Sequence, residues 1–383
     1  MHDWIEQAIG VLLLLILLLD VFLTVLYARI GTGIISGRVA HLVWRLFLWG
    51  SRPFAHHRGR ILSFCGPVIL VVGVLVWAFG LTFGSALILH PLLGMSIRAT
   101  AGPTPTDFVT ALFVAGSSIS VVGASDFTPH TGPTRMLFLF NSLIGMSVLS
   151  LILTYLMQVY TALRERNVLG FKVQLLSADT GDAAELVAGL GPEGQFSGGY
   201  TNLADMAVEM TSVKEAHHFY PVLFYFRFVY AHYSVSRVVL MGLDTVTLIK
   251  SALDDRQFAW LKESASVAHL ARVCMVLATT LEDTFVPGGA PRRNRDIDVE
   301  TRDRWRRRYF AALKRFRQVG IQTIEDEEAG AEAYVVLRAG WERHIATLAP
   351  CMAYAIEEID PAGSNPERVE QRPPFKARLR SLE

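Results

Sequence analysis

Three long apolar runs dominate the first 160 residues of the chain. They cover residues 4–27, 61–89 and 136–160, and the sequence after them mixes apolar with charged positions. A helix needs about 20 apolar residues to cross the hydrocarbon core of a bilayer. The pattern therefore predicts three transmembrane helices. The first run has no basic segment before it and no small-residue cleavage site after it, so we expect a span rather than a signal peptide.

Arginines between the runs indicate how the spans are oriented. The segment between the first and second runs contains no acidic residue and six arginines: Arg29, Arg38, Arg45, Arg52, Arg58 and Arg60. Three further basic residues follow the third run, whereas two acids precede the first. Since cytoplasmic loops carry an excess of Lys and Arg, we expect a multi-pass protein of the inner (plasma) membrane. Its N-terminus lies outside and its C-terminal domain is cytoplasmic.

The first cytoplasmic loop has helical periodicity over residues 34–49. Leu42 and Leu46 share one face with other apolar residues, and Arg38 and Arg45 share another. We interpret residues 29–60 as a basic helix lying on the cytoplasmic surface of the membrane; packing against the pore helices is the alternative. Asp20 is the one acid inside a span. Such acids are costly, and we expect it to pair with an interfacial arginine or to take part in transport.

A second short apolar segment lies between the second and third runs. Thr106 or Asp107 can cap a helix that continues to about Ser117, and the loop VVGASDFTP follows it. This helix is too short to span. A short helix and a loop at membrane depth are tolerated only where protein or a water-filled cavity shelters their backbone. The segment therefore predicts a re-entrant helix and loop that line a pore.

Residues 61–167 resemble the pore module of the potassium-channel superfamily, with its outer helix, pore helix, filter and inner helix. The overall layout is similar to bacterial ion-channel family proteins with an added N-terminal span. The resemblance implies a homotetramer around a central ion pathway that can hold a monovalent cation such as K⁺. The filter sequence TVGYGD of that family falls, after Ser120, on Val121, Val122, Gly123, Ala124, Ser125 and Asp126.

The loop departs from the family pattern at positions that matter for selectivity. Val121 replaces a threonine whose hydroxyl lines the innermost ion site, and Ala124 replaces an aromatic side chain that braces the filter. Ser125 replaces a glycine, and a left-handed residue other than glycine costs about 1–2 kcal/mol. Val114 stands where the family has a tryptophan that meets Asp126. We therefore expect weak selectivity among cations if the pore conducts.

The third run has a helical stripe that the resemblance assigns to the pore axis. Its members are Met146, Leu149, Leu153 and Met157, and Gly145 lies just before them. Gly145 falls at the hinge glycine of the family's inner helix. A mostly apolar lining can close a pore by dewetting, so these residues are the predicted gate. Simple packing of the helix against lipid or neighbouring helices is the alternative.

The chain divides into five predicted parts. Residues 1–28 are an extra N-terminal transmembrane helix, 29–60 the interfacial helix and 61–167 the pore module. Residues 168–360 are a helical cytosolic domain and 361–383 a disordered tail rich in Pro and charge. The apolar stretch 217–243 contains two arginines and a proline, so we expect core helices there rather than a fourth span. The fold class is all-α: three spans with a re-entrant pore helix, then cytosolic helices.

Composition agrees with this division and adds little chemistry. Only 19% of the 383 residues are charged, below the quarter typical of soluble domains. The three cysteines lack any ligand spacing, so we expect neither a disulfide framework nor a metal site. No GxSxG, HExxH, Walker A or EF-hand pattern occurs. Residues 189–194 match GxGxxG, but a helical pattern precedes them and Pro192 interrupts them, so we interpret the match as a helix end rather than a nucleotide site. The expected partners are other copies of the chain and membrane lipid, not nucleic acid.

The sequence favours two functions over a third, a membrane-bound enzyme, because none of the common catalytic motifs occurs. The first is a homotetrameric cation channel with the unusual filter VVGASD. The second is a membrane sensor or scaffold that uses the same fold without conducting ions. In neither do we expect catalytic activity or a cofactor beyond a pore cation.

Overall fold

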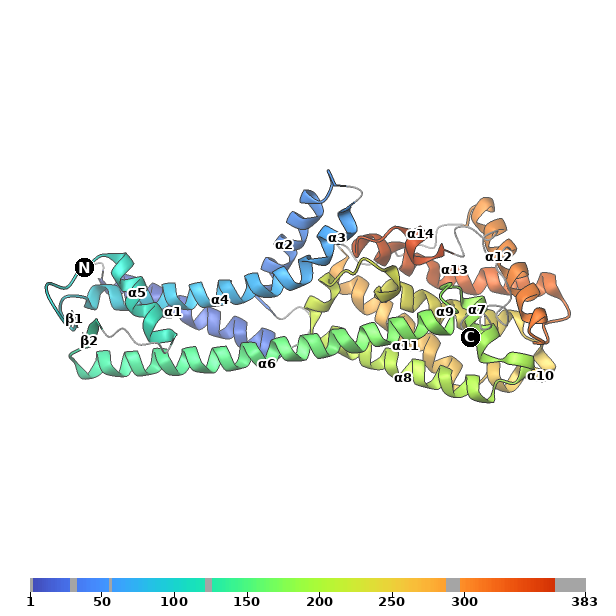
Figure 1. Cartoon of the computed structure of the whole chain (residues 1–383), viewed down its shortest axis with the longest axis horizontal. Coiled ribbons are helices and arrows are strands. Elements are labelled where there is room, and N and C mark those ends of the chain that lie inside the picture. Colours follow the sequence, from blue (N-terminus) through green and yellow to red (C-terminus); the bar gives the residue numbers. More distant parts are fainter. Residues whose placement is uncertain (1–2, 28–32, 55–56, 121–125, 287–296, 362–383) are drawn as a thin grey trace, which may run out of the picture. The chain divides into compact units, whose positions relative to one another are not determined.

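The computed structural model describes residues 3–27, 33–54, 57–120, 126–286 and 297–361. These residues form two compact units (Figure 1). Unit 1 comprises residues 1–50, 64–161 and 219–222. Unit 2 comprises residues 51–63, 162–218 and 223–383. The long helix α6 (Gly132–Leu176) begins in unit 1 and ends in unit 2, and it therefore runs beyond the predicted span 136–160.

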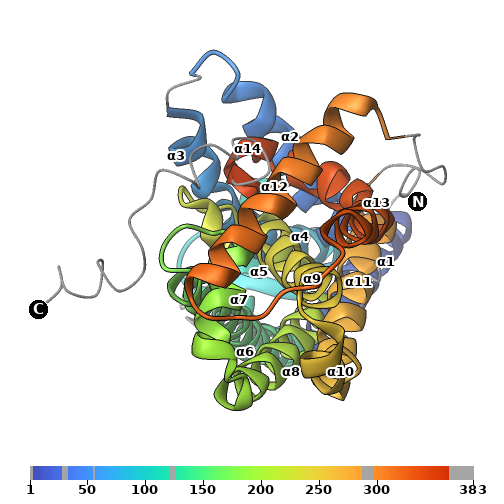
Figure 2. The same ribbon diagram turned by 90° about the vertical axis from the view of Figure 1, so that its right-hand side faces the viewer.

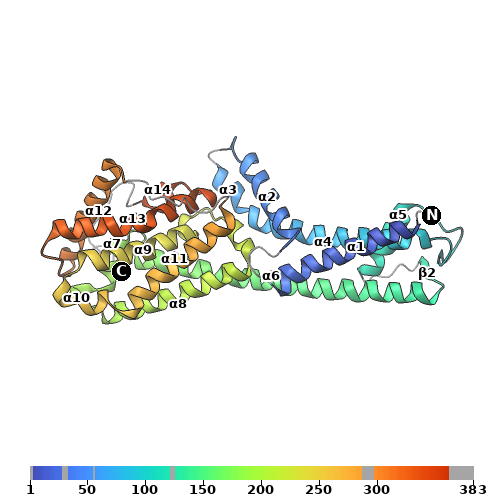
Figure 3. The same ribbon diagram turned by 180° about the vertical axis from the view of Figure 1, so that it is seen from behind.

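Three long helices build unit 1. They are α1 (Asp3–Val21), α4 (Cys65–Leu89) and the first part of α6, and α1 continues as the short π-helix η1 (Phe22–Leu26). Figure 3 shows α1 lying alongside α4. A Cβ on Gly10 would lie only 2.6 Å from the carbonyl oxygen of Gly84, so glycine is what allows the two backbones to approach. Leu17, Trp77 and Ile152 bring the three helices together in one apolar core.

Asp20 connects three elements at the C-terminal end of α1. One carboxylate oxygen accepts a hydrogen bond of 2.7 Å from the backbone N–H of Ile35, and the other accepts one of 2.8 Å from Nε1 of Trp77 on α4. The N–H of Ser36 also points at this carboxylate, at 3.3 and 3.4 Å. Ile35 and Ser36 open helix α2 (Ser36–Gly50), the helix predicted over residues 34–49. The buried acid thus caps α2 and ties it to α1 and α4.

A small antiparallel ribbon closes the opposite end of unit 1. After α4, a 3-10 turn η3 (His90–Leu92) leads to β1 (Ile97–Ala99), then to helix α5 (Phe108–Ile119), and β2 (Phe127–Pro129) leads into α6. Strands β1 and β2 pair with Ile97 opposite Pro129 and Ala99 opposite Phe127. The ribbon joins the segment before α5 to the segment after the loop.

Unit 2 is helical in its described part and is built around one buried helix. Every residue of α9 (Val235–Ala252) except Lys250 is buried, including the charged Arg237 and Asp244. Figure 2 shows α9 in the middle of its neighbours. These are α7 (Ala183–Leu190), α11 (Ala265–Phe285), α12 (Val299–Gln318) and α13 (Glu327–Cys351).

The remaining helices of unit 2 are α3 (Arg58–Ser63), α8 (Ser197–Phe219), α10 (Asp255–Lys262) and α14 (Ile356–Ile359). The described residues after α4 also form 3-10 turns: η3 in unit 1, then η4 (Pro192–Gly194), η5 (Pro221–Tyr225) and η6 (Ala231–Tyr233). The apolar stretch 217–243 is therefore not one helix: α8 ends within it, two 3-10 turns follow, and α9 begins. This agrees with core packing rather than a span.

Five charged side chains form a buried ion cluster in unit 2. Asp244 of α9 accepts hydrogen bonds from Arg308, from Arg338 at 3.3 Å and from the Tyr334 hydroxyl at 2.7 Å. Asp182 lies 3.4 Å from Arg308, and Asp360 pairs with Arg338. All five ionised groups are buried. The cluster joins α9 to α12, to α13 and to the chain beyond α14.

The buried side chain of His217, on α8, makes the stability of the folded chain depend on pH. Burial, and then the nearby charge of Arg166, lower the pKa of this imidazole to about 3, although its Nδ1 donates a 2.9 Å hydrogen bond to the Val213 carbonyl. In the unfolded chain the same imidazole has its ordinary pKa of 6.5. Between these two values the unfolded state binds more protons, so stability falls as the pH falls. The loss is about 1.4 kcal/mol per pH unit below 6.5, or about 2 kcal/mol at pH 5.

Urea unfolding of the full chain in detergent at pH 7, 6 and 5 measures this slope. We expect His217→Gln to flatten it and the exposed His269→Gln to leave it unchanged. An unaltered slope in His217→Gln would show that other groups cause the acid sensitivity.

Four helical segments among the described residues are long and apolar enough to cross a membrane. They are Asp3–Leu26, Arg58–Leu92, Gly132–Leu176 and Ala265–Phe285. The first three overlap the three predicted spans. The fourth is α11 of unit 2, which the sequence analysis assigned to the cytosolic domain.

Candidate functional site

Helix α5 and the loop after it form the candidate site. The helix begins at Asp107, one of the two caps predicted, whose carboxylate accepts from the backbone N–H of Thr110 at 3.0 Å and from its hydroxyl at 2.7 Å. One face of α5 is buried against α4, where Ala111, Val114 and Ala115 join an apolar cluster. Val114 therefore lies on the buried side of α5.

A buried polar network fixes the C-terminal half of α5. Asn141 of α6 donates from Nδ2 to the hydroxyl of Ser85 on α4 at 2.7 Å and to that of Ser118 on α5 at 3.1 Å. The neighbouring Ser142 hydroxyl donates to the Ser118 carbonyl at 2.9 Å. Hydrogen bonds between membrane helices hold them in register, since the alternative is an unsatisfied polar group in hydrocarbon. Three helices thus meet at Ser118.

Gly145 allows α6 to lie directly against the end of α5. A Cβ at this position would lie 1.8 Å from the carbonyl oxygen of Ile119 and 2.7 Å from its carbonyl carbon. No side chain can occupy that space unless a backbone moves. The predicted hinge residue is therefore a close-packing residue in this structure, and its helix is continuous on both sides.

Backbone hydrogen bonds hold both ends of the loop. Ser120 closes α5, with its N–H donating to the Gly116 carbonyl at 2.9 Å. On the far side, the carbonyl of Asp126 accepts from the N–H of Thr100 at 2.8 Å, next to the β1–β2 ribbon. Val121, Val122, Gly123, Ala124 and Ser125 lie outside the described residues. Their two anchors, Ser120 and the exposed Asp126, are both described.

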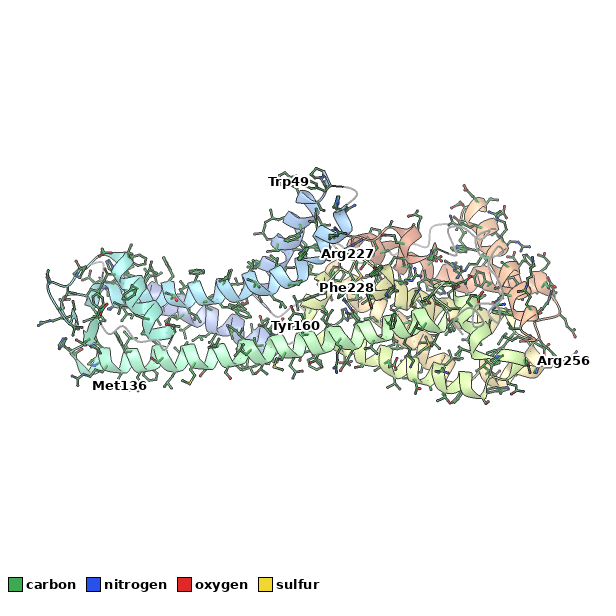
Figure 4. All side chains as sticks on the ribbon, in the orientation of Figure 1. Trp49, Met136, Tyr160, Arg227, Phe228 and Arg256 are labelled. Atoms are coloured by element: carbon green, nitrogen blue, oxygen red, sulfur yellow. The ribbon has the colours of Figure 1, made fainter. Side chains whose placement is uncertain are left out.

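The predicted gating stripe lies on the exposed side of α6 within unit 1. Met146, Leu149, Leu153 and Met157 are each more than half exposed, and Met157 reaches 73%. The opposite side of the helix carries buried residues, including Val148, Ile152 and Tyr155. Figure 4 marks Met136 and Tyr160 near the two ends of this part of α6. The described residues thus leave a continuous apolar face of α6 uncovered, as a pore lining or a lipid-facing surface requires.

Sequence reasoning did not single out the groups that position this site. Asn141, Ser85 and Ser118 are ordinary polar residues of apolar helices, and only their meeting in space gives them a role. The same is true of His90, whose Nδ1 lies 2.8 Å from Oε1 of Glu6 on α1. The His90 ring also packs edge-on against Phe108 at the start of α5. The sequence signal for this polar network is that each of the three apolar helices contains a polar residue.

These features define the class of protein: the chain is an all-α membrane protein with several apolar helices long enough to span. Over 248 residues it is 21% identical to the "Uncharacterized membrane protein YdjJ" of Bacillus subtilis (strain 168), covering 64% of this chain and 70% of that protein. No family model matches the chain. No solved structure matches it either.

Proposed function

We propose that the protein is a homotetrameric membrane pore for monovalent cations. Four copies would surround a central axis, because one α5–loop segment supplies a quarter of a closed ring. The observation that supports the proposal is the way in which α5 is held by its neighbours. It is a 12-residue apolar helix, too short to span, that is locked between two long helices and ends at a loop held on both sides.

Three spans are proposed rather than four. Helix α11 is apolar enough to cross a membrane, but its residues Leu270, Cys274 and Leu277 are buried against the rest of unit 2. Its buried Glu282 lies 2.7 Å from His344 of α13. A helix with a paired buried acid and a protein-facing apolar side fits the interior of a cytosolic domain. The arginine distribution then orients the N-terminus outward and unit 2 toward the cytoplasm.

Weak selectivity among cations follows from the loop sequence. The potassium-channel superfamily has a threonine, an aromatic residue and a glycine at the positions of Val121, Ala124 and Ser125. The chain therefore lacks that hydroxyl, that bracing ring and that glycine, so ions would pass partly hydrated. Asp126 near the outer mouth favours cations over anions. The same departures favour the second candidate, a sensor or scaffold that does not conduct. The two candidates differ in one measurable property, ion flux.

Purified protein in liposomes is expected to pass K⁺ and Na⁺ at similar rates and Cl⁻ much more slowly. The triple variant Val121→Thr, Ala124→Tyr, Ser125→Gly restores the family's hydroxyl ring, brace and glycine. We expect it to raise the K⁺/Na⁺ permeability ratio by about tenfold, a difference of about 1.4 kcal/mol in ion binding. Reversal potentials under opposed K⁺ and Na⁺ gradients measure the ratio.

Asp107→Asn serves as a matched control, because it changes a charge at the start of α5 and keeps a good helix cap. It should leave the permeability ratio unchanged. Strong K⁺ selectivity in the unmodified protein would contradict the argument from the loop. Absence of flux in both the unmodified protein and the triple variant would favour the scaffold.

A further inference from the structure

Helix α2 presents a mixed basic and apolar face that no described residue of unit 1 covers. Its buried residues, Ala40, Val43 and Trp44, lie on the side that packs against α4. Its other side exposes six residues: Arg38, His41, Leu42, Arg45, Leu46 and Trp49. Trp49 is 70% exposed, and Leu42 and Leu46 are more than half exposed. Apolar side chains of this size and number on a solvated face need a covering partner.

The positive charge on this face has no acidic counterpart on α2 or α4. No Asp or Glu occurs between residue 21 and residue 106, so neither α2 nor α4 supplies an acid. The nearest acid in the sequence, Asp20, directs its carboxylate at the backbone of α2 and at Trp77. Among the described residues, Arg38 and Arg45 form no salt bridge; a guanidinium nitrogen of Arg38 donates to the Ile34 carbonyl. Two arginines are therefore available to an external anion.

The spacing of these residues selects the kind of anion. Arg38, Leu42, Arg45 and Trp49 follow one another at four, three and four residues, so bases and apolar side chains share one stripe. A nucleic acid or a free phosphate would satisfy the arginines and leave Leu42, Leu46 and Trp49 in water. A phospholipid surface satisfies both, since headgroups meet the bases while acyl chains receive the apolar groups. Tryptophan favours this boundary as well.

The orientation of α2 suits such a surface. Figure 1 shows α2 leaving the bundle at a steep angle to α4, and Figure 4 shows Trp49 at the end farther from α4. Asp20 holds the first turn of α2 to two helices that qualify as membrane spans. A helix that leaves a spanning helix steeply from its end lies near the plane of the interface. The exposed face is thereby held in place before any lipid binds.

We propose that α2 binds the anionic headgroups of the cytoplasmic leaflet through Arg38 and Arg45, with Leu42, Leu46 and Trp49 inserted among the acyl chains. The chemical class of the ligand is an anionic glycerophospholipid within a bilayer. The contact does not require that the protein conduct ions, so it can hold or fail independently of the pore.

Native mass spectrometry of the full chain in mild detergent tests the proposal, with phosphatidylglycerol or phosphatidylcholine as the added lipid. An arginine at a membrane surface contributes about a fivefold change in affinity for anionic lipid. The variant Arg38→Gln, Arg45→Gln should therefore bind phosphatidylglycerol about 25-fold more weakly and phosphatidylcholine as before. Leu46→Ser should weaken the binding of both lipids. Arg256→Gln, an exposed arginine of unit 2 (Figure 4), is the matched control and should change neither.

Three results would overturn the proposal. The first is equal affinity of the double variant and the unmodified protein for phosphatidylglycerol. The second is displacement of the lipid by an equal concentration of soluble glycerol phosphate, which would indicate a headgroup site without a membrane. The third is loss of a protein–protein complex in the double variant with no change in bound lipid, which would assign the face to a second copy. Thermal unfolding of each variant identifies any loss that is due to misfolding.

Discussion

Replacing Gly145 by alanine is expected to destabilise unit 1 by about 3 kcal/mol, at the upper end of the cost of overpacking a core. The added methyl group would overlap the carbonyl of Ile119, which is backbone and cannot rotate away. Either α6 or the end of α5 must shift, and Ser120 moves with it. Thermal unfolding of the full chain in detergent measures the loss, and liposome flux reports on the loop.

Gly73→Ala is the matched control, because Gly73 also lies within a long apolar helix but faces open space. Its effect should stay within about 0.5 kcal/mol. The hinge hypothesis predicts a different outcome for Gly145→Ala: normal stability with altered opening. A variant that unfolds like the unmodified protein would therefore refute the packing argument and revive the hinge.

Asp244→Ala is expected to produce the largest loss in unit 2, about 3–5 kcal/mol. This carboxylate faces the guanidinium groups of Arg308 and Arg338 and the hydroxyl of Tyr334, all buried. Removing one partner of a buried ion pair leaves an uncompensated charge, which costs more than the pair contributes. Asp182 and Asp360 remain nearby and limit the loss.

Urea unfolding of the full chain, followed by intrinsic fluorescence, measures this effect. Trp305 and Trp341 both lie close to Arg338, so their emission reports on the cluster. Asp255→Ala is the control, since Asp255 pairs with Lys262 but is largely exposed, and exposed pairs contribute about 0–1 kcal/mol. Equal losses in the two variants would mean that the buried cluster is no more important than a surface pair.

The sequence was informative where structure depends on local pattern. The length of an apolar run predicts a helix that can span, and the α1, α4 and α6 segments meet that criterion. Asp107 followed by an apolar stretch predicts the start of α5, and the periodicity of residues 34–49 predicts α2. Each of these signals lies within about 25 consecutive residues. No knowledge of the rest of the chain is needed to interpret them.

The remaining features depend on pairs of residues far apart in the chain. Asn141 meets Ser85 across 56 positions, and Asp20 meets Trp77 across 57. In the sequence, nothing distinguishes these four residues from other polar or aromatic residues in apolar helices. The extension of α6 to Leu176 was also missed, because the charged residues after residue 160 end the apolar pattern without ending the helix. The predicted filter residues 121–125 and the tetramer stay predictions.

The way in which the loop is held has an evolutionary consequence. Its anchors use the Thr100 N–H, the Ser118 hydroxyl and the absence of a side chain at Gly145, all of which lie outside residues 121–125. Mutations within the loop therefore leave the supporting framework intact. A lineage can therefore exchange residues of this loop one at a time without removing the groups that hold its two ends.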